Sequence, residues 1–101
     1  VTKDEIDDPH DLNMELTVNG EIRQKSSTRN LIFKIPDIIE ILSQDMTLEP
    51  GDIIGTGTPA GVALGMSPPR YLKVNDVVEA RIDGLGHIRN RVVEKQMPKR
   101  A

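Results

Sequence analysis

Cysteine is absent from the 101 residues, and aromatic side chains nearly so: Phe33 and Tyr71 are the only two, and there is no tryptophan. Without thiols the chain cannot form disulfides, thiolate nucleophiles or cysteine-ligated zinc sites. Without large aromatic side chains, its core must consist of Ile, Leu, Val and Met. A domain of this size buries only about 60–65% of its unfolded surface. We therefore expect a marginal independent fold, or a part of something larger.

Neither an excess of basic residues nor a long apolar run is present. The chain has thirteen Lys and Arg and sixteen Asp and Glu, which gives a formal net charge of −3 at pH 7. Nucleic-acid binding usually requires a basic surface. No apolar stretch approaches the ~20 residues that cross a bilayer, and no secretory signal is visible. We expect a soluble, cytoplasmic segment with neither nucleic-acid nor membrane partners, and the absence of cysteine suits that compartment.

The first quarter of the chain predicts a linker followed by a β-hairpin. Residues 1–11 are polar and acidic, which indicates a loop or linker. From residue 12 to residue 18 apolar and polar side chains alternate, which is typical of a half-buried antiparallel strand. Asn19-Gly20 is a strong hairpin signal because both residues tolerate positive φ. The returning strand is expected at residues 21–24, and a loop at residues 25–30.

A helical period follows the hairpin. Apolar residues recur at helical spacing and form one stripe: Ile35, Ile38, Ile39, Leu42 and Met46. Pro36 suits the first turn, where its missing N–H costs nothing. Lys34 is a poor N-cap because its side chain cannot accept hydrogen bonds from the free N–H groups of the first turn. The pattern predicts one helix over residues 36–46.

Two turns of similar sequence lie on either side of a glycine-rich stretch. Residues 48–52 read LEPGD and residues 72–76 read LKVND, and a pair of β-branched residues follows each. Gly or Asn takes the left-handed position before Asp in both turns. The first turn predicts a strand that begins at Ile53, and the second predicts a strand over residues 77–82.

The end of the chain predicts a second hairpin. Asp83-Gly84 separates the strand over residues 77–82 from another expected at residues 87–93. The charged residues 94–101 are expected to fray. Together these elements predict an α+β, mostly β fold, a mixed β-roll or sandwich with one helix.

The stretch GTGTPAG at residues 55–61 invites a phosphate-loop interpretation, which its spacing contradicts. A dinucleotide fingerprint needs G-x-G-x-x-G ahead of a helix. Here the third glycine comes one residue late, Pro59 intervenes, and no helical stripe follows. Two alternatives remain: the glycines only permit tight turns, or Thr58 and backbone N–H groups face a small anionic ligand.

Other candidate ligand groups are sparse. An acidic cluster with His10 contains ligand types for a hard cation, yet it fits a solvated linker better: Glu5, Asp7 and Asp8. His87 follows Gly86 in the second hairpin, where a surface or packing role is expected. The residues by themselves show no self-sufficient active site.

Three strings nevertheless resemble a known family: DLNMELTVNGEIRQ at 11–24, LIFKIPDIIEILSQDMTLEPGDIIGTGTPAGV at 31–62 and NDVVEARIDGLGHIRNRVV at 75–93. They resemble the C-terminal part of the fumarylacetoacetate hydrolase family, above all its bacterial 2-hydroxyhepta-2,4-diene-1,7-dioate isomerases and acylpyruvate hydrolases. The resemblance implies that residues 12–93 are the C-terminal segment of the catalytic domain, within a mixed β-roll. It also implies a homodimer that takes part in breakdown of aromatic compounds.

The resemblance further implies a Mg²⁺ or Mn²⁺ ion bound by a Glu-x-Glu pair and an Asp, with a catalytic Lys. Those residues lie N-terminal to the matching strings in the family, and this sequence contains no Glu-x-Glu. Neither catalytic residues nor metal ligands are therefore expected in this segment. Thr58, beside Gly57, matches the residue that donates to the substrate carboxylate, and Pro59, Gly61 and Val62 match the loop that holds it. The resemblance thus implies that Gly57, Thr58 and Pro59 bind substrate.

Two functional hypotheses follow. In the first, the parent protein is a metal-dependent enzyme that acts on small 2-oxo or 1,3-dioxo acids by C–C bond hydrolysis, enol–keto isomerisation or decarboxylation. This segment alone would then be inactive. In the second, it is a non-catalytic stand-alone fragment or degenerate family member that acts through self-association of open sheet edges.

Overall fold

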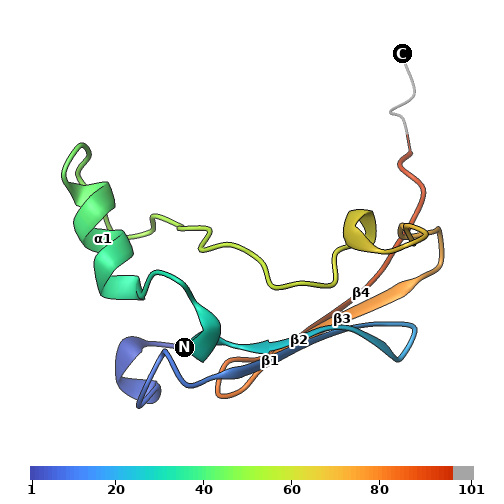
Figure 1. Ribbon diagram of the computed structural model, residues 1–101, viewed down its shortest axis with the longest axis horizontal. Coiled ribbons are helices and arrows are strands. Elements are labelled where there is room, and N and C mark those ends of the chain that lie inside the picture. The colour runs from blue at the N-terminus through green and yellow to red at the C-terminus, as the bar shows by residue number, and fades with distance from the viewer. Residues whose placement is uncertain (97–101) are drawn as a thin grey trace.

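The computed structural model describes residues 1–96, which form a four-stranded antiparallel sheet and one α-helix (Figure 1). The strands lie in the order β2-β1-β3-β4, with bounds as follows: β1 Asn13–Val18, β2 Glu21–Ser27, β3 Val77–Ile82 and β4 Gly86–Arg91. Helix α1 spans Ile35–Ser43, and short 3₁₀ helices span Lys3–Glu5, Thr28–Asn30 and Ala63–Gly65. The predicted mostly β class with one helix is confirmed. Of the tail expected to fray, residues 97–101 lie outside the described residues.

The first hairpin turns where the sequence predicts, but its second strand is longer. Asn19 and Gly20 have φ of 53° and 80°, the conformation of a tight type I′ turn. Strand β2 continues to Ser27 because β1 still offers it partners there, with Asn13 opposite Ser27. The loop predicted over residues 25–30 was therefore wrong in its first half.

One face of the sheet is apolar, as the alternation in β1 predicts. Residues directly opposite each other in adjacent strands share a face, and Leu16 and Val18 lie opposite Ala80 and Val78. Val18, at 4% exposure, is the one fully buried apolar residue among residues 1–96. The radius of gyration, 17.1 Å, exceeds the roughly 13 Å of a compact domain of this length. The described part of the chain is therefore an open layer rather than a closed core.

Helix α1 ends at Ser43, so the prediction of a helix to residue 46 was too long. The last turn tightens, with the Gln44 N–H donating to Ile41 O at 3.4 Å, and Met46 lies beyond it with 55% exposure. Continuation of the apolar stripe stabilises a helix only where the stripe packs against something. Within residues 1–96 nothing covers Met46 sufficiently to extend the helix.

The strand predicted to begin at Ile53 does not form within the described residues. The preceding turn does form: Asp52 N–H donates to Glu49 O at 3.0 Å, and Asp52 Oδ2 accepts from Glu49 N–H at 2.8 Å. Ile53 follows outside any strand, with 96% exposure. A turn is stabilised locally, whereas a strand requires a neighbour for its ladder.

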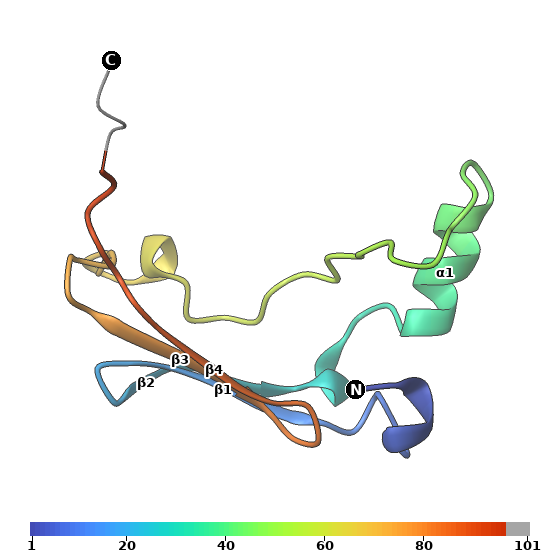
Figure 2. The ribbon, with the colours of Figure 1, turned by 180° about the vertical axis from the view of Figure 1, so that it is seen from behind.

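The segment after α1 returns across the sheet on its way to β3. Figures 1 and 2 show it running above one face of the sheet, with α1 near the end where the N-terminus lies. Strand β4 begins at Gly86 and ends at Arg91, slightly earlier than the predicted 87–93. Within residues 1–96, no helix is long and apolar enough to cross a bilayer.

Candidate functional site

The glycine-rich loop lies directly against strand β2. Gly61 has φ of 108°, and a Cβ on it would lie 1.9 Å from Arg23 O. Both the backbone conformation and this contact therefore require glycine at Gly61. Gly57 has a similar φ of 107° but open space around it. The loop backbone therefore contacts β2 at Gly61, whereas no atom beyond the neighbouring residues lies within 4 Å of a Cβ placed on Gly57.

The side chain of Gln24, in β2, makes two hydrogen bonds to the same loop. The amide nitrogen Nε2 of Gln24 donates to Thr58 Oγ1 at 3.0 Å and to Pro59 O at 2.9 Å. The two bonds therefore join one amide nitrogen to two successive residues of the loop. The loop therefore has a fixed position relative to the sheet although it contains no regular secondary structure.

An irregularity in β2 lets two successive residues hold the returning segment. The pairing with β1 shifts register between Leu16 and Thr17, which leaves Arg23 without a direct partner and is typical of a β-bulge. Arg23 Nη1 donates to Arg70 O at 3.4 Å and contacts Met66 Sδ at 3.7 Å. Because successive strand residues ordinarily point to opposite faces, the bulge explains how Arg23 and Gln24 can both contact this segment.

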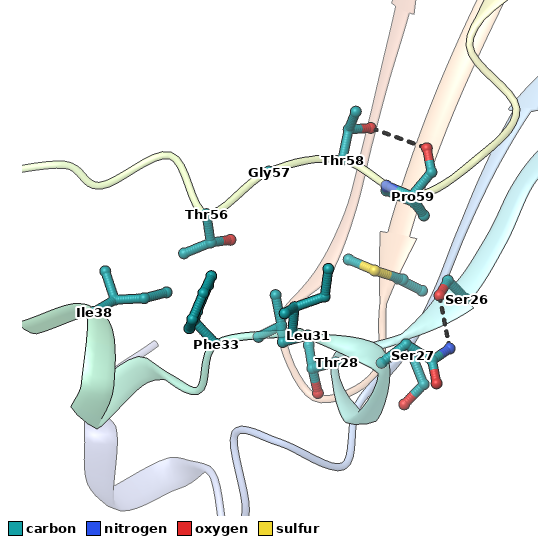
Figure 3. A pocket seen from close by; sticks show the side chains of 13 residues that line it. Ser26, Ser27, Thr28, Leu31, Phe33, Ile38, Thr56, Gly57, Thr58 and Pro59 are labelled. Carbon is teal, nitrogen blue, oxygen red and sulfur yellow. Dashed lines mark hydrogen bonds between the residues drawn. The ribbon is translucent and has the colours of Figure 1, made fainter. Parts of the chain in front are cut away.

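A cavity of about 360 Å³ lies between the loop and the segment that enters α1 (Figure 3). Phe33 and Leu31 point toward the loop, and the Thr56 side chain points toward Phe33. The lining consists of apolar side chains, hydroxyls and the Asn30 amide, and among residues 1–96 no acidic, basic or histidine side chain belongs to it. The cavity therefore offers an anion no opposite charge from the described residues.

Thr58 also borders this cavity, but its side chain lies on the other side of the loop from Phe33 (Figure 3). Its hydroxyl is directed toward Pro59 O, 3.5 Å away. Thr58 is exposed. The two threonines of the loop thus face different surroundings, Thr56 the side chain of Phe33 and Thr58 the Gln24 amide of β2.

The helix side of the cavity is held by the N-terminal segment. Lys34, the N-cap, makes no capping bond with its side chain, as the sequence predicts. Instead His10 Nε2 accepts from the Ile35 N–H at 3.1 Å. An imidazole nitrogen that accepts a hydrogen bond carries no proton, so the ring is in its Nδ1–H form. A residue of the predicted linker therefore satisfies a free N–H at the start of α1.

Charged side chains gather at the opposite end of the loop segment. Arg70 donates two hydrogen bonds to the Glu21 carboxylate, at 2.7 and 3.1 Å. These bonds lower the pKa of Glu21 and raise that of Arg70. Asp76 accepts from the Lys73 backbone N–H and from the Asn19 amide, which lowers its pKa.

The described residues do not converge as metal ligands. Within residues 1–96 no group of three or more His, Asp or Glu is placed to hold a cation. In the acidic N-terminal cluster, Asp8 accepts from the backbone N–H of His10 at 2.9 Å, and the His10 ring faces α1. No catalytic step through a metal can be assigned to these residues.

The three residues predicted to contact substrate are adjacent in the loop and border one cavity: Gly57, Thr58 and Pro59. Their role in binding stays a prediction. No role in the site was predicted for Gln24, although a signal for one was available. Gln24 lies opposite Leu16, and therefore on the apolar face, where a polar amide is expected to have a hydrogen-bonding partner.

Residues 1–93 match the model of the fumarylacetoacetate (FAA) hydrolase C-terminal domain. The chain belongs to this family. The oxaloacetate tautomerase YisK of Bacillus subtilis is 48% identical over 92 residues, which cover 91% of this chain and 31% of the relative.

Solved structures of proteins in this family resemble the chain. A maleylpyruvate hydrolase from Sphingobium sp. SYK-6, in complex with manganese(II) and pyruvate, has a TM-score of 0.85 and 42% identity, covering 95% of this chain and 34% of that one. A 2-hydroxyhepta-2,4-diene-1,7-dioate isomerase from Mycobacterium marinum has a TM-score of 0.75 and 39% identity, covering 89% and 33%. The predicted family is confirmed, and 2-hydroxyhepta-2,4-diene-1,7-dioate isomerases are among the similar structures. The chain spans about a third of these relatives' length and corresponds to the C-terminal part of enzymes.

Proposed function

We propose that this chain forms the carboxylate-binding loop of an enzyme that acts on small 2-oxo acids. The names of the relatives support a common substrate unit, since oxaloacetate, maleylpyruvate and pyruvate all carry a carboxylate next to a 2-oxo group. Oxaloacetate tautomerisation and maleylpyruvate hydrolysis differ in the bond that changes. The substrates of both reactions carry a 2-oxo group, whose oxygen can bear the negative charge of an enolate.

The observation that carries this proposal is the Thr58 hydroxyl, which is exposed on a loop fixed to the sheet. A hydroxyl held in one place can donate to a substrate carboxylate without first being ordered, and such preorganisation strengthens binding. The ligand would lie on the side of the loop to which the Thr58 side chain points, away from Phe33. The cavity is less suited to an anion because no cationic side chain among residues 1–96 lines it.

A divalent cation, Mg²⁺ or Mn²⁺, completes the proposed site, with ligands supplied from outside the described residues. Manganese in the Sphingobium structure supports this choice. Such an ion polarises a carbonyl and stabilises developing negative charge. The chain's own contribution is to bind and orient the carboxylate. C–C bond hydrolysis, enol–keto isomerisation and decarboxylation are all compatible with that contribution.

The test uses the complete protein that contains this chain, assayed with oxaloacetate and acetylpyruvate in the presence of Mg²⁺, Mn²⁺ or a chelator. Separate readouts of enol absorbance, acetylpyruvate cleavage and CO₂ release distinguish the three reactions. We expect Thr58→Val to raise KM about tenfold or more, because a hydrogen bond to a charged group contributes roughly 1.5–3 kcal/mol. Thr58→Ser should restore most of the affinity.

Thr56→Val is the matched control because it removes a hydroxyl from the same loop on the cavity side. It should change KM less than twofold. If Thr56→Val raises KM while Thr58→Val does not, the ligand occupies the cavity and the proposed role of Thr58 is wrong. If neither oxaloacetate nor acetylpyruvate is turned over with either metal, the enzymatic proposal fails for these substrates.

A non-catalytic, self-associating role is the second candidate, favoured by the exposed apolar side chains. Ile32 and Leu64 are 90% and 75% exposed, and such surfaces usually meet a partner. A homodimer and a cytoplasmic location, expected from the family resemblance and the composition, remain proposals. Light scattering on the complete protein measures its mass in solution. Self-association without metal-dependent turnover would favour this second role.

A further inference from the structure

The contact between Gln24 and Thr58 determines whether the Thr58 hydroxyl donates or accepts a hydrogen bond. The two hydrogen bonds of the Gln24 side chain come from one atom, Nε2, which reaches Thr58 Oγ1 at 3.0 Å and Pro59 O at 2.9 Å. A carboxamide nitrogen carries two protons. Both are therefore engaged, one with each loop residue.

The Pro59 carbonyl determines which end of the amide faces the loop. A carbonyl oxygen can only accept, and proline has no N–H of its own. If the amide were turned over, its oxygen would face the Pro59 oxygen at hydrogen-bond distance, two acceptors in contact. The nitrogen must therefore face Pro59. The same nitrogen lies beside Thr58, so the Thr58 oxygen accepts.

This direction leaves the hydroxyl proton of Thr58 available. A hydroxyl has one proton to donate and two lone pairs that accept, and Gln24 occupies a lone pair. The acceptor that the loop itself offers this proton is Pro59 O at 3.5 Å, which is longer than the roughly 2.5–3.0 Å of an ordinary O–H···O hydrogen bond, so the proton can turn from this weak contact to a stronger acceptor. An N–H that donates to a hydroxyl oxygen also polarises its O–H bond and strengthens the bond which that proton makes.

We infer that Gln24 is a positioning residue, whose amide fixes and polarises the Thr58 hydroxyl so that it donates to the substrate carboxylate. The inference rests on the proposed function, since Thr58 is the residue that touches substrate. Gln24 acts through Thr58. Its effect on binding must therefore disappear when the Thr58 hydroxyl is absent, which a general contribution to loop stability does not require.

The experiment is a double-mutant cycle in the complete protein, with KM for oxaloacetate or acetylpyruvate and Ki for pyruvate as readouts. Gln24→Met keeps the length of the side chain and removes its donors. We expect it to raise KM about five- to tenfold, with kcat changed less. In the Thr58→Val background the same substitution should change KM less than twofold. Lys25→Met, at the next position of β2, is the control and should leave KM unchanged.

Gln24→Glu tests whether position 24 must carry a donor, while the double-mutant cycle separates positioning from a structural role. The carboxylate of this variant would accept the Thr58 proton and face the Pro59 oxygen, so KM at neutral pH should rise more than in Gln24→Met. The ratio of KM to wild type should fall as the pH is lowered toward 5, because the protonated acid regains an O–H donor.

The outcomes separate the two proposals. If Thr58→Val raises KM but Gln24→Met does not, or if the two effects are additive, the inference is overturned while the proposed function stands. If Thr58→Val changes neither KM nor Ki, the role of Thr58 is wrong and this inference falls with it. Thermal unfolding of each variant shows whether a change in KM accompanies loss of fold.

Discussion

The cavity has two walls that are held in different ways. The loop wall, residues 56–59, meets β2 through the Gln24 amide and through the close approach of Gly61 to Arg23 O. The helix wall, residues 31–38, contacts the N-terminal segment through the hydrogen bond from the Ile35 N–H to His10, and Lys34 Nζ donates to Arg29 O at 2.9 Å. Backbone packed on backbone leaves little freedom, whereas one bond to a side chain can break without disturbing the sheet. We therefore expect the loop wall to move with the sheet and the helix wall to move more independently of it.

The largest effect is expected from Gly61→Ala, which would detach the loop wall. The positive φ alone costs of order 1–3 kcal/mol in a residue with a Cβ, and the contact with Arg23 O adds to that cost because the loop must move. We expect a clear fall in the free energy of unfolding and loss of affinity for the 2-oxo acid. Denaturant unfolding and KM of the complete protein measure both.

Gly57→Ala is the matched control for this variant, since it imposes similar strain where a Cβ meets nothing within 4 Å. The difference between the two variants isolates the contact with the sheet. Equal losses in both would show that the close approach of Gly61 contributes nothing to holding the loop.

A smaller effect is expected from His10→Ala on the helix wall. The substitution leaves the Ile35 N–H without its partner, at a cost of about 1–2 kcal/mol. His10→Gln places a carbonyl oxygen near the same point and should recover most of this loss. Hydrogen exchange of the Ile35 amide is the direct measurement. Faster exchange at Ile35 with unchanged exchange in β2 would bear out the independence of the walls, and loosening of both would contradict it.

Acid should produce the smallest change, confined to the loop side. Arg70 lowers the pKa of Glu21 below its ordinary value of 4.5, so the pair's contribution to stability is present above that value. It is lost as the pH falls through the depressed pKa of the folded state. Arg70→Met should abolish this part of the acid dependence, measured as the thermal midpoint between pH 6 and pH 3. An identical acid response in wild type and variant would mean that the exposed pair adds no stability.

The sequence predicts what is stabilised locally. The turn at Asn19-Gly20 and the strand at Val77–Ile82 follow from turn residues and alternation, and both are observed. The turns that end at Asp52 and Asp76 close with the same pair of hydrogen bonds. Only the second leads into a strand, because Val77 pairs with Arg91 of β4 and accepts from the Asn19 N–H, whereas no strand among residues 1–96 pairs with Ile53.

What the sequence does not predict depends on contacts between distant residues. Gly57, Thr58 and Pro59 could be proposed as a binding loop from their motif. The role of Gln24, 34 positions away from Thr58, requires the register of the hairpin and the course of the returning segment. His10 was assigned to a linker because its partner, the Ile35 N–H, is a backbone group without a sequence signature.

The supports of both walls have a consequence for how such a site can be inherited. The cavity lining and the contacts that hold it lie between His10 and Gly61, in one continuous half of the chain. A single crossover on each side of that stretch would transfer the loop, its anchor and the helix cap together. Exchanges of this region between relatives should preserve the geometry around Thr58, whereas a crossover between Gln24 and Thr58 would separate the hydroxyl from the amide that orients it.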